Sequence, residues 1–181
     1  MQKINIIEDF YSPQDYGLIY NAIKTIPLKG TYQPKGIYYP SRLDAYPCWE
    51  SDSLTENNLE YSIFKQTFEQ KTNIKVKNIQ SFYRKIIKEE LKNSPFADKN
   101  EGMVHKDNEV KEIAGLIYFD SFSLKDGTRF YSYDNQVEPD IIIGSKPNRC
   151  VFYPSNINHS AGIDWRKEDR SIQVFFLEID K

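Results

Sequence analysis

The sequence predicts a mostly β (α+β) domain, in which two or so N-terminal helices support a β-sandwich or barrel. Apolar residues repeat at helical spacing only within residues 1–73, whereas residues 74–181 hold short apolar or alternating runs separated by Gly, Pro, Asn and Asp. Neither a repeat nor a linker divides the 181 residues, which suffice to bury about 70% of the unfolded surface in one core. We therefore expect a single domain over residues 1–181.

A first helix is predicted to follow a short N-terminal strand. Ser12 suits the N-cap, and Pro13 suits the first helical position. Ile19, Ile23 and Ile26 then recur at helical spacing before Pro27 ends the helix.

A second helix is predicted over residues 56–71, with Thr55 as its cap. Its apolar face would consist of Leu59, Ile63, Phe64 and Phe68. We expect both helices to pack against the back of a sheet.

The strands are predicted after Asn73, at residues 74–87, 111–119, 128–133, 138–143, 148–153 and 169–179.

Two segments lack a regular pattern. Residues 28–54 interleave aromatic side chains with prolines, and residues 91–103 contain Asn-Ser-Pro and Asn-Glu-Gly. Because long ordered loops are often functional, we expect these segments to form walls of a site.

Composition narrows the class of protein. A net charge of −2 gives no electrostatic reason to expect binding to nucleic acid or to an anionic membrane. The chain has no apolar run of the roughly 20 residues that span a bilayer and no signal-peptide core, so we expect a soluble protein. Cys48 and Cys150 are too few and too unpatterned for a disulfide scaffold or a zinc site, which favours a reducing, cytoplasmic location.

The two histidines of the chain are its most informative residues. His105 stands two positions before Asp107, and His159 follows later. In an extended segment His105 and Asp107 project to one face, with Cα atoms roughly 6.5 Å apart, while Lys106 points away. Two imidazoles and one carboxylate can occupy one face of an octahedral metal and leave three positions open, as in non-haem Fe(II) oxygenases. We therefore predict that His105, Asp107 and His159 bind one iron.

Motifs in the same order carry a resemblance to a known family. After His105-Lys106-Asp107 come the strand IAGLIYFD at 113–120, the turn and strand GTRF at 127–130, PNRCVF at 147–152 and DRSI at 169–172. This succession over residues 74–180 resembles the Fe(II)- and 2-oxoglutarate-dependent dioxygenases, most closely their prolyl-hydroxylase-like branch. In this chain Asn148-Arg149 stands where that branch has a Gly-containing pair.

The resemblance implies a double-stranded β-helix, or jelly roll, and a reaction that uses Fe(II), 2-oxoglutarate and O2 to hydroxylate a C–H bond. It also implies a cation that binds the far carboxylate of 2-oxoglutarate. Arg170 is our candidate, because its planar fork can bind a carboxylate through two hydrogen bonds. By alternation Arg170 shares a face with the apolar Ile172, Val174 and Phe176.

Other residues could share or replace that role. Arg166 or Lys167 would take it if the last strand began earlier. By position, Tyr118 and Tyr83 match two tyrosines that line the cosubstrate pocket of prolyl hydroxylases.

The substrate is predicted from family analogy to be a prolyl residue of a peptide or protein, with a free amino acid or another small molecule as the alternative. A nucleic-acid demethylase is disfavoured because position 176, where that class carries a second Arg, is Phe. A halogenase lacks the carboxylate ligand, whereas Asp107 is present. A non-catalytic cupin-like protein is disfavoured by the complete triad together with Arg170. The sequence does not indicate an oligomeric state.

Overall fold

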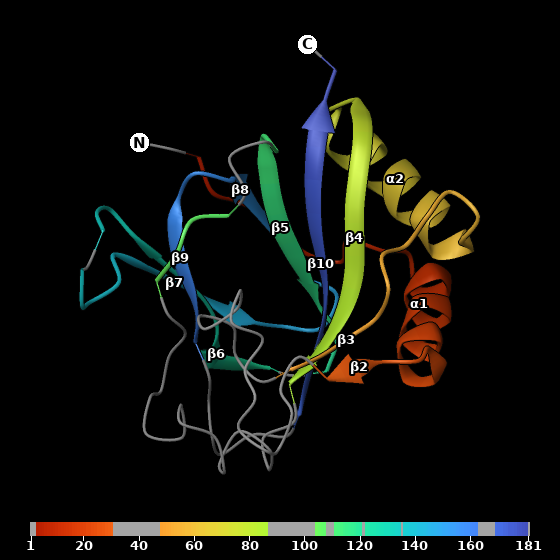
Figure 1. The fold of residues 1–181 in the computed structure, drawn as a ribbon, viewed down its shortest axis with the longest axis horizontal. Helices are drawn as coiled ribbons and strands as arrows, with labels where there is room; N and C mark the ends of the chain where they lie inside the picture. The colour runs from red at the N-terminus through yellow and green to blue at the C-terminus, as the bar shows by residue number, and fades with distance from the viewer. Residues whose placement is uncertain are drawn as a thin grey trace.

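The computed structural model describes residues 3–30, 48–86, 104–107, 111–120, 122–134, 136–162 and 169–180. Within these ranges the strands form two antiparallel sheets (Figure 1). The larger sheet has the order β1 (Asn5–Ile7), β8 (Cys150–Pro154), β5 (Ile113–Tyr118), β10 (Arg170–Ile179), β4 (Val76–Ile86), β3 (Trp49–Glu50) and β2 (Lys29–Gly30). The smaller has the order β7 (Ile141–Ser145), β6 (Ser123–Tyr131) and β9 (Asn158–Gly162). This is the predicted jelly roll.

Helix α1 (Pro13–Thr25) forms as predicted. The Ser12 side chain accepts a hydrogen bond from the Asp15 backbone N–H at 3.1 Å, and Ile19 and Ile23 are buried. Helix α1 and helix α2 (Leu59–Thr72) lie on the same side of the larger sheet (Figure 1).

Helix α2 departs from the prediction at its start. It begins three residues late, with Asn58 rather than Thr55 at the N-cap. Thr55 instead donates to the Asn58 side chain through its backbone N–H and its hydroxyl, in the turn before the helix. This start turns Leu59 outward, where it is 58% exposed, and the buried face consists of Tyr61, Phe64 and Phe68.

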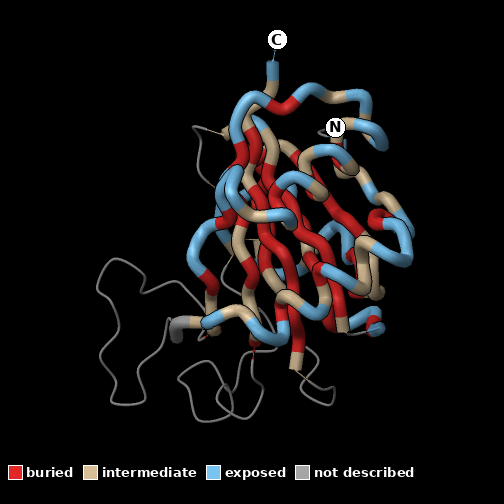
Figure 2. The backbone as a smooth tube through the Cα atoms, turned by 90° about the vertical axis from the view of Figure 1, so that its right-hand side faces the viewer, coloured by how far each residue is buried: buried red, intermediate tan, exposed pale blue. Residues whose placement is uncertain are grey.

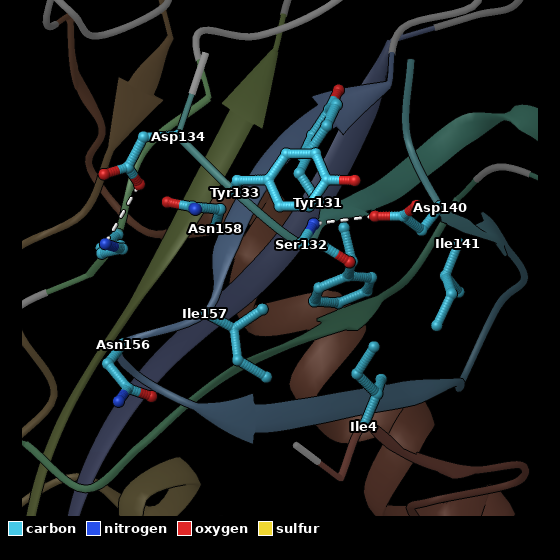
Figure 3. Close-up of a pocket in the computed structure, with 12 residues that line it drawn as sticks. Ile4, Tyr131, Ser132, Tyr133, Asp134, Asp140, Ile141, Asn156, Ile157 and Asn158 are labelled. Atoms are coloured by element: carbon cyan, nitrogen blue, oxygen red, sulfur yellow. Dashed lines mark hydrogen bonds and ion pairs between the residues drawn. The ribbon is translucent and has the colours of Figure 1, made fainter. Parts of the chain in front are cut away.

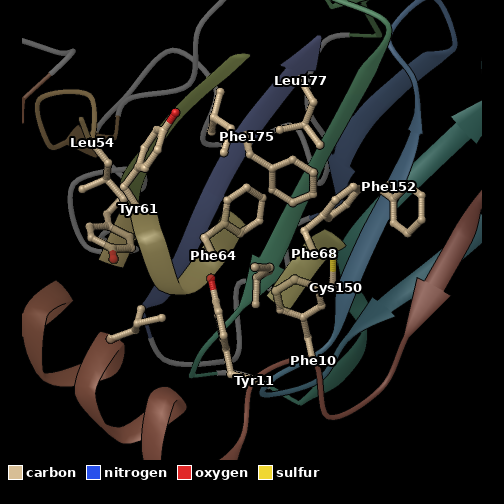
Figure 4. Packing of buried hydrophobic residues seen from close by; sticks show 14 of the residues in the cluster. Phe10, Tyr11, Leu54, Tyr61, Phe64, Phe68, Cys150, Phe152, Phe175 and Leu177 are labelled. Carbon is tan, nitrogen blue, oxygen red and sulfur yellow. The ribbon is translucent and has the colours of Figure 1, made fainter. Parts of the chain in front are cut away.

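The helix-side core fills the space between the helices and the larger sheet (Figure 4). The Phe64 and Phe68 rings lie 4.8 and 5.8 Å from the ring of Phe175 on β10. Gly115 on the neighbouring β5 permits this approach, because a Cβ atom there would collide with the Phe175 ring and the Val151 carbonyl. The helices therefore fix the central strands from behind.

The inter-sheet core is formed by buried residues of both sheets: Ala114, Leu116, Tyr118, Phe130, Ile143, Val151, Tyr153, Ile157, Ile172 and Val174. The central strands are buried along much of their length (Figure 2). Strand β10 contributes side chains to both cores, because successive side chains of a strand point to opposite faces. Ile172 and Val174 face the smaller sheet, whereas Phe175 and Leu177 face the helices.

The strand predictions hold best in the larger sheet, where β4, β5, β8 and β10 lie within the predicted ranges or one residue beyond them. In the smaller sheet β6 begins at Ser123 and β7 at Ile141, so both predicted ranges were shifted. Strand β9, with the sequence NHSAG, was not predicted at all. It lacks β-branched residues and apolar alternation, and its pairing with β6 defines it.

The loop before β8 accounts for the Asn148-Arg149 departure from the family pattern. Asn148 has a φ of 62°, the left-handed conformation that a glycine would otherwise supply. Its amide accepts from the Tyr11 N–H at 2.8 Å and donates to the Tyr11 carbonyl at 2.9 Å. Asparagine therefore provides the turn and also ties it to the N-terminal segment.

Candidate metal centre and its surroundings

His105, Asp107 and His159 converge in the structure, with one ligand atom of each within 4.8 Å of the others. The His159 Nε2 lies 3.3 Å from Asp107 Oδ2, and the His105 Nε2 lies 3.8 Å from Asp107 Oδ1. The two imidazole centroids are 4.4 Å apart. Ligands at about 2 Å from one ion lie roughly 3 Å from each other, so small side-chain shifts would close the set around a metal.

Backbone pairing brings these residues together. His105 and His159 form an antiparallel bridge, in which the His105 N–H donates to the His159 carbonyl at 3.0 Å and the reverse bond measures 2.9 Å. The Asp107 N–H donates to the Ser155 carbonyl at 3.0 Å. The segment 104–107 is thereby held as an extra edge beside β9. Lys106 points away from the ligands and pairs with Asp134 at 3.1 Å, as the alternation predicted.

His159 is prepared for coordination by its surroundings. It is 7% exposed, and its Nδ1 lies 3.0 Å from the Ile157 carbonyl. Because a carbonyl only accepts, Nδ1 carries the proton and Nε2 presents its lone pair toward Asp107. Burial lowers the pKa of His159 below its ordinary value, although the Asp107 carboxylate acts in the opposite direction. The neutral imidazole, which is the form that binds a metal, is therefore favoured.

Asp107 is oriented by a second contact. The Tyr153 hydroxyl, from β8, forms a hydrogen bond with its carboxylate, and burial raises the pKa of Tyr153 well above its ordinary value. Tyr153 therefore stays protonated and acts as a donor. His105, by contrast, has a side chain that is 49% exposed. The set thus offers two imidazole nitrogens and one carboxylate, with one side open to ligands from solvent, which fits a divalent iron.

Arg170 lies between the two sheets and is 2% exposed. Its Nη1 donates to the carbonyls of Gly162 at 3.0 Å and Gly127 at 3.4 Å, and it forms an ion pair with the buried Asp126 at 3.2 Å. The guanidinium therefore reaches across from β10 to β6 and β9. The prediction that it shares a face with Ile172 and Val174 is confirmed, because both belong to the inter-sheet core.

Tyr118 lies beside this arginine. Its ring is 5.8 Å from the guanidinium carbon of Arg170, and its hydroxyl shares a 2.6 Å hydrogen bond with the Thr128 hydroxyl. Burial raises the pKa of Tyr118, and Arg170 partly offsets that shift. A guanidinium and two hydroxyls thus gather in one buried region, a combination suited to a carboxylate. Thr128 belongs to the GTRF motif at 127–130, but no role in the site was predicted for it, and nothing in the sequence singled out Asp126.

Tyr83 does not lie with the other predicted cosubstrate residues. It belongs to the helix-side core, on the opposite face of β4, and is fully buried there. Tyr83 therefore does not face the inter-sheet core that contains Tyr118, because alternation places Phe82 and Arg84 on that face of β4. Both faces of β4 are covered by other elements, so apolar residues point to both faces. The sequence pattern of β4 therefore does not show which of its residues face the helices and which face the smaller sheet.

A cavity of about 760 Å³ lies next to the ligand segment, lined by sequence neighbours of the ligands rather than by the ligands themselves (Figure 3). Lys106 and Asn158 contribute to its wall, together with Phe130, Ile157 and residues of the β6–β7 connection. His105, Asp107 and His159 are not among the residues that line this cavity.

Several predictions fall outside the described residues. Arg166 and Lys167 lie there, as do residues 31–47 of the aromatic segment and the whole of the predicted segment 91–103. Cys48 and Cys150 are both free thiols. Neither described helix is long and apolar enough to cross a bilayer.

No family model and no curated sequence matches this chain. Solved structures do match in fold. A prolyl-4-hydroxylase from Pseudomonas putida is 10% identical, with a TM-score of 0.61 over 100% of this chain and 95% of that chain. A prolyl hydroxylase from Trichoplax adhaerens, in complex with a hypoxia inducible factor oxygen degradation domain peptide fragment, is 9% identical, with a TM-score of 0.62 over 98% and 84%.

A third match is the non-heme alpha ketoglutarate dependent epimerase SnoN from nogalamycin biosynthesis, which is 9% identical, with a TM-score of 0.63 over 98% of this chain and 79% of that chain. At such low identities the likeness establishes the fold. The chain therefore has the jelly-roll fold of these structures along nearly its whole length.

Proposed function

We propose that this chain is an Fe(II)- and 2-oxoglutarate-dependent dioxygenase that hydroxylates a C–H bond. The observation that carries the proposal is the pairing of two features on one scaffold. His105, Asp107 and His159 gather their ligand atoms within 4.8 Å, and Arg170 is buried between the same two sheets. Neither feature is needed for a purely structural jelly roll, since a buried guanidinium is costly to maintain.

In this proposal His105, Asp107 and His159 hold the iron. Together with 2-oxoglutarate and O2, the iron would supply an oxidation that transfers one oxygen atom to the substrate and releases succinate and CO2. Three coordination positions remain for the two cosubstrates. The sheets exclude water around His159, and Tyr153 holds Asp107 in place through its hydroxyl.

Arg170 would bind the far carboxylate of 2-oxoglutarate, supported by the hydroxyls of Tyr118 and Thr128. Asp126 already pairs with Nη1 of Arg170, so this carboxylate would bind the donors of the guanidinium that Asp126 does not use. Nε of Arg170 is buried and has no hydrogen-bond partner among the described residues. That nitrogen is one donor through which a carboxylate could approach without displacing Asp126.

The substrate we propose is a prolyl residue of a peptide or protein. Support comes from the resemblance to prolyl hydroxylases in sequence and from fold matches to prolyl hydroxylases, one of which was solved with a peptide. A small-molecule substrate is the second candidate, favoured by the match to an epimerase from nogalamycin biosynthesis.

Succinate formation tests the activity. Purified protein with Fe(II), ascorbate and 2-oxoglutarate should release succinate, and the rate should rise when a substrate is added. Proline-containing peptides and free amino acids are screened in parallel, and products are inspected for the mass of one added oxygen atom. Hydroxylation of a free amino acid with all peptides inert would discard the peptidyl-proline substrate. Absence of succinate under every condition, from protein shown to bind Fe(II), would contradict the dioxygenase activity itself.

A further inference from the structure

The cavity of about 760 Å³ beside the ligand segment lies at the end of the row of paired residues that carries two candidate metal ligands. His105 pairs with His159, which pairs in turn with Phe130 of β6. Phe130 pairs with Ile141 of β7, and both line the cavity. The centre of the Phe130 ring is 6.4 Å from the centre of the His159 ring. Phe130 therefore forms part of the cavity wall and lies next to a candidate ligand.

Much of the cavity wall is apolar. Phe130 and Ile157 are buried members of the inter-sheet core, and Ile4 packs against that core. Ile141 is 38% exposed and lies on the same side of the cavity as Asp140 (Figure 3). The cavity volume falls within the range of roughly 300–1,000 Å³ that is typical of ligand sites. An alkyl chain could therefore pack on this wall and end near Asp140.

The charged residues of the cavity wall are not balanced. Lys106, Asp134 and Asp140 are the charged residues among the described ones that line it, which leaves one excess negative charge. Asp134 pairs with Lys106 at 3.1 Å. Asp140 lies on the other side of the cavity (Figure 3), and its partners within the described ranges are the uncharged Ser132 and Gln136. The excess charge therefore belongs to Asp140.

The connection between β6 and β7 holds the Asp140 carboxylate in place. Its Oδ2 accepts a hydrogen bond from the Ser132 N–H at 2.7 Å, and the Asp140 N–H donates to the Phe130 carbonyl at 2.9 Å. Hydrogen bonds with Ser132 and Gln136 lower the pKa of Asp140, so its exposed side chain is ionised at neutral pH. An asparagine oxygen could accept the same hydrogen bond from Ser132, so the turn does not require the charge. A carboxylate that is oriented in advance suits an ammonium or guanidinium group.

Building on the proposed function, we propose that this cavity binds a lysine or arginine side chain of the peptide or protein substrate. The alkyl stem packs on Ile4, Ile141 and Ile157, and the cationic end pairs with Asp140. Lysine and arginine combine such a stem with a charged end. Four extended residues span about 14 Å, enough for one polypeptide to reach both the metal residues and a cavity whose wall adjoins His159. The basic residue therefore lies within about four positions of the reacting prolyl residue.

The test uses fluorescein-labelled peptides with a central proline and four residues on either side, in which a single lysine is moved through every flanking position. Fluorescence anisotropy measures their binding to full-length protein saturated with Mn(II) and 2-oxoglutarate, without oxygen so that no turnover occurs. At the matching position, lysine should bind roughly tenfold more tightly than norleucine, which keeps the stem but lacks the charge; this factor is about 1.4 kcal/mol. Norleucine should in turn bind more tightly than alanine, because of its stem.

Asp140→Asn removes the charge and keeps an oxygen that can accept from the Ser132 N–H. This variant should lose the preference for lysine and bind the norleucine peptide like wild type. Glu138→Gln is the matched control, because Glu138 is an exposed carboxylate of the same connection that does not line the cavity. It should keep the preference, and an equal loss in both variants would indicate general electrostatic attraction and overturn the proposal.

Acetylation of the peptide lysine removes the charge from the ligand instead, so the test does not depend on whether Asp140→Asn folds. With wild-type protein, the acetylated peptide should bind no more tightly than the norleucine peptide. If wild type binds 2-oxoglutarate but binds lysine no better than norleucine at every position, or binds none of the peptides, this inference is overturned and the proposed function stands. If wild type binds neither Mn(II) nor 2-oxoglutarate, the proposed function is overturned, and this inference with it.

Discussion

The backbones of His105 and His159 exchange a pair of hydrogen bonds of 3.0 and 2.9 Å, which fixes the relative position of two imidazoles that lie 54 residues apart in the chain. The geometry of the metal residues is therefore set by the main chain before any metal binds. The side chains need only small adjustments, and substitution of one ligand should leave the bridge intact.

We expect His159→Ala to abolish high-affinity binding of divalent metal while the protein stays folded. The lost imidazole is one of three ligands, whereas the backbone bridge does not depend on its side chain. Calorimetric titration with Mn(II) measures the affinity, and circular dichroism checks the fold. Lys106→Ala, which alters the same segment but points away from the ligands, is the matched control and should bind Mn(II) like wild type.

Tyr153→Phe should weaken metal affinity by roughly ten- to hundredfold, the usual cost of losing a partner that orients a ligand. The variant removes only the hydroxyl that is bonded to Asp107. Tyr131→Phe is its control, since that hydroxyl bonds Ser160 instead. Equal Mn(II) affinities for the two variants would refute the role of Tyr153.

Arg170→Met should raise the 2-oxoglutarate concentration needed for binding by tenfold or more, since losing one partner of a buried charge pair costs about 2–5 kcal/mol. The single variant also removes the guanidinium that pairs with the buried Asp126. We therefore pair it with Arg170→Met/Asp126→Asn, which removes both charges. Both variants should keep their metal affinity, and an unchanged 2-oxoglutarate requirement would transfer the role to Arg166 or Lys167.

The metal-free protein should lose stability as the pH falls below the ordinary histidine range, about 6.5. The pKa of His159 is lower in the folded protein than in the unfolded chain. At a pH between these two pKa values, His159 binds a proton in the unfolded chain but not in the folded protein. The free energy of unfolding therefore decreases with falling pH across that window. His159→Asn should flatten this part of the profile in urea titrations, and an identical profile for both proteins would contradict the burial effect.

Phe64→Ala should destabilise the fold by about 3–5 kcal/mol, because it empties part of the helix-side core against Phe10, Phe68 and Phe175. The metal residues lie on the other side of the larger sheet. Below the melting transition the variant should bind Mn(II) with wild-type affinity, and loss of binding in the folded variant would show that the two cores are coupled.

The sequence revealed those features that depend on local spacing. His105 and Asp107 stand two residues apart, and the alternation after Arg170 correctly assigned the inner face of β10. The sequence did not show which distant strands pair with each other. The strand that carries His159 has no strand-like composition and forms through its register with β6, and the phase of Tyr83 is set by its pairing with Gln173.

The most direct test of the central claim is an anaerobic absorption titration of the Fe(II)-loaded protein with 2-oxoglutarate. Chelation of the metal by a 2-oxo acid produces a visible charge-transfer band, so it reports metal and cosubstrate in one site. We predict a band that saturates at one 2-oxoglutarate per chain in the wild type and is absent in Asp107→Ala. A wild-type protein without the band, or an Asp107→Ala variant that retains it, would contradict the assignment of His105, Asp107 and His159.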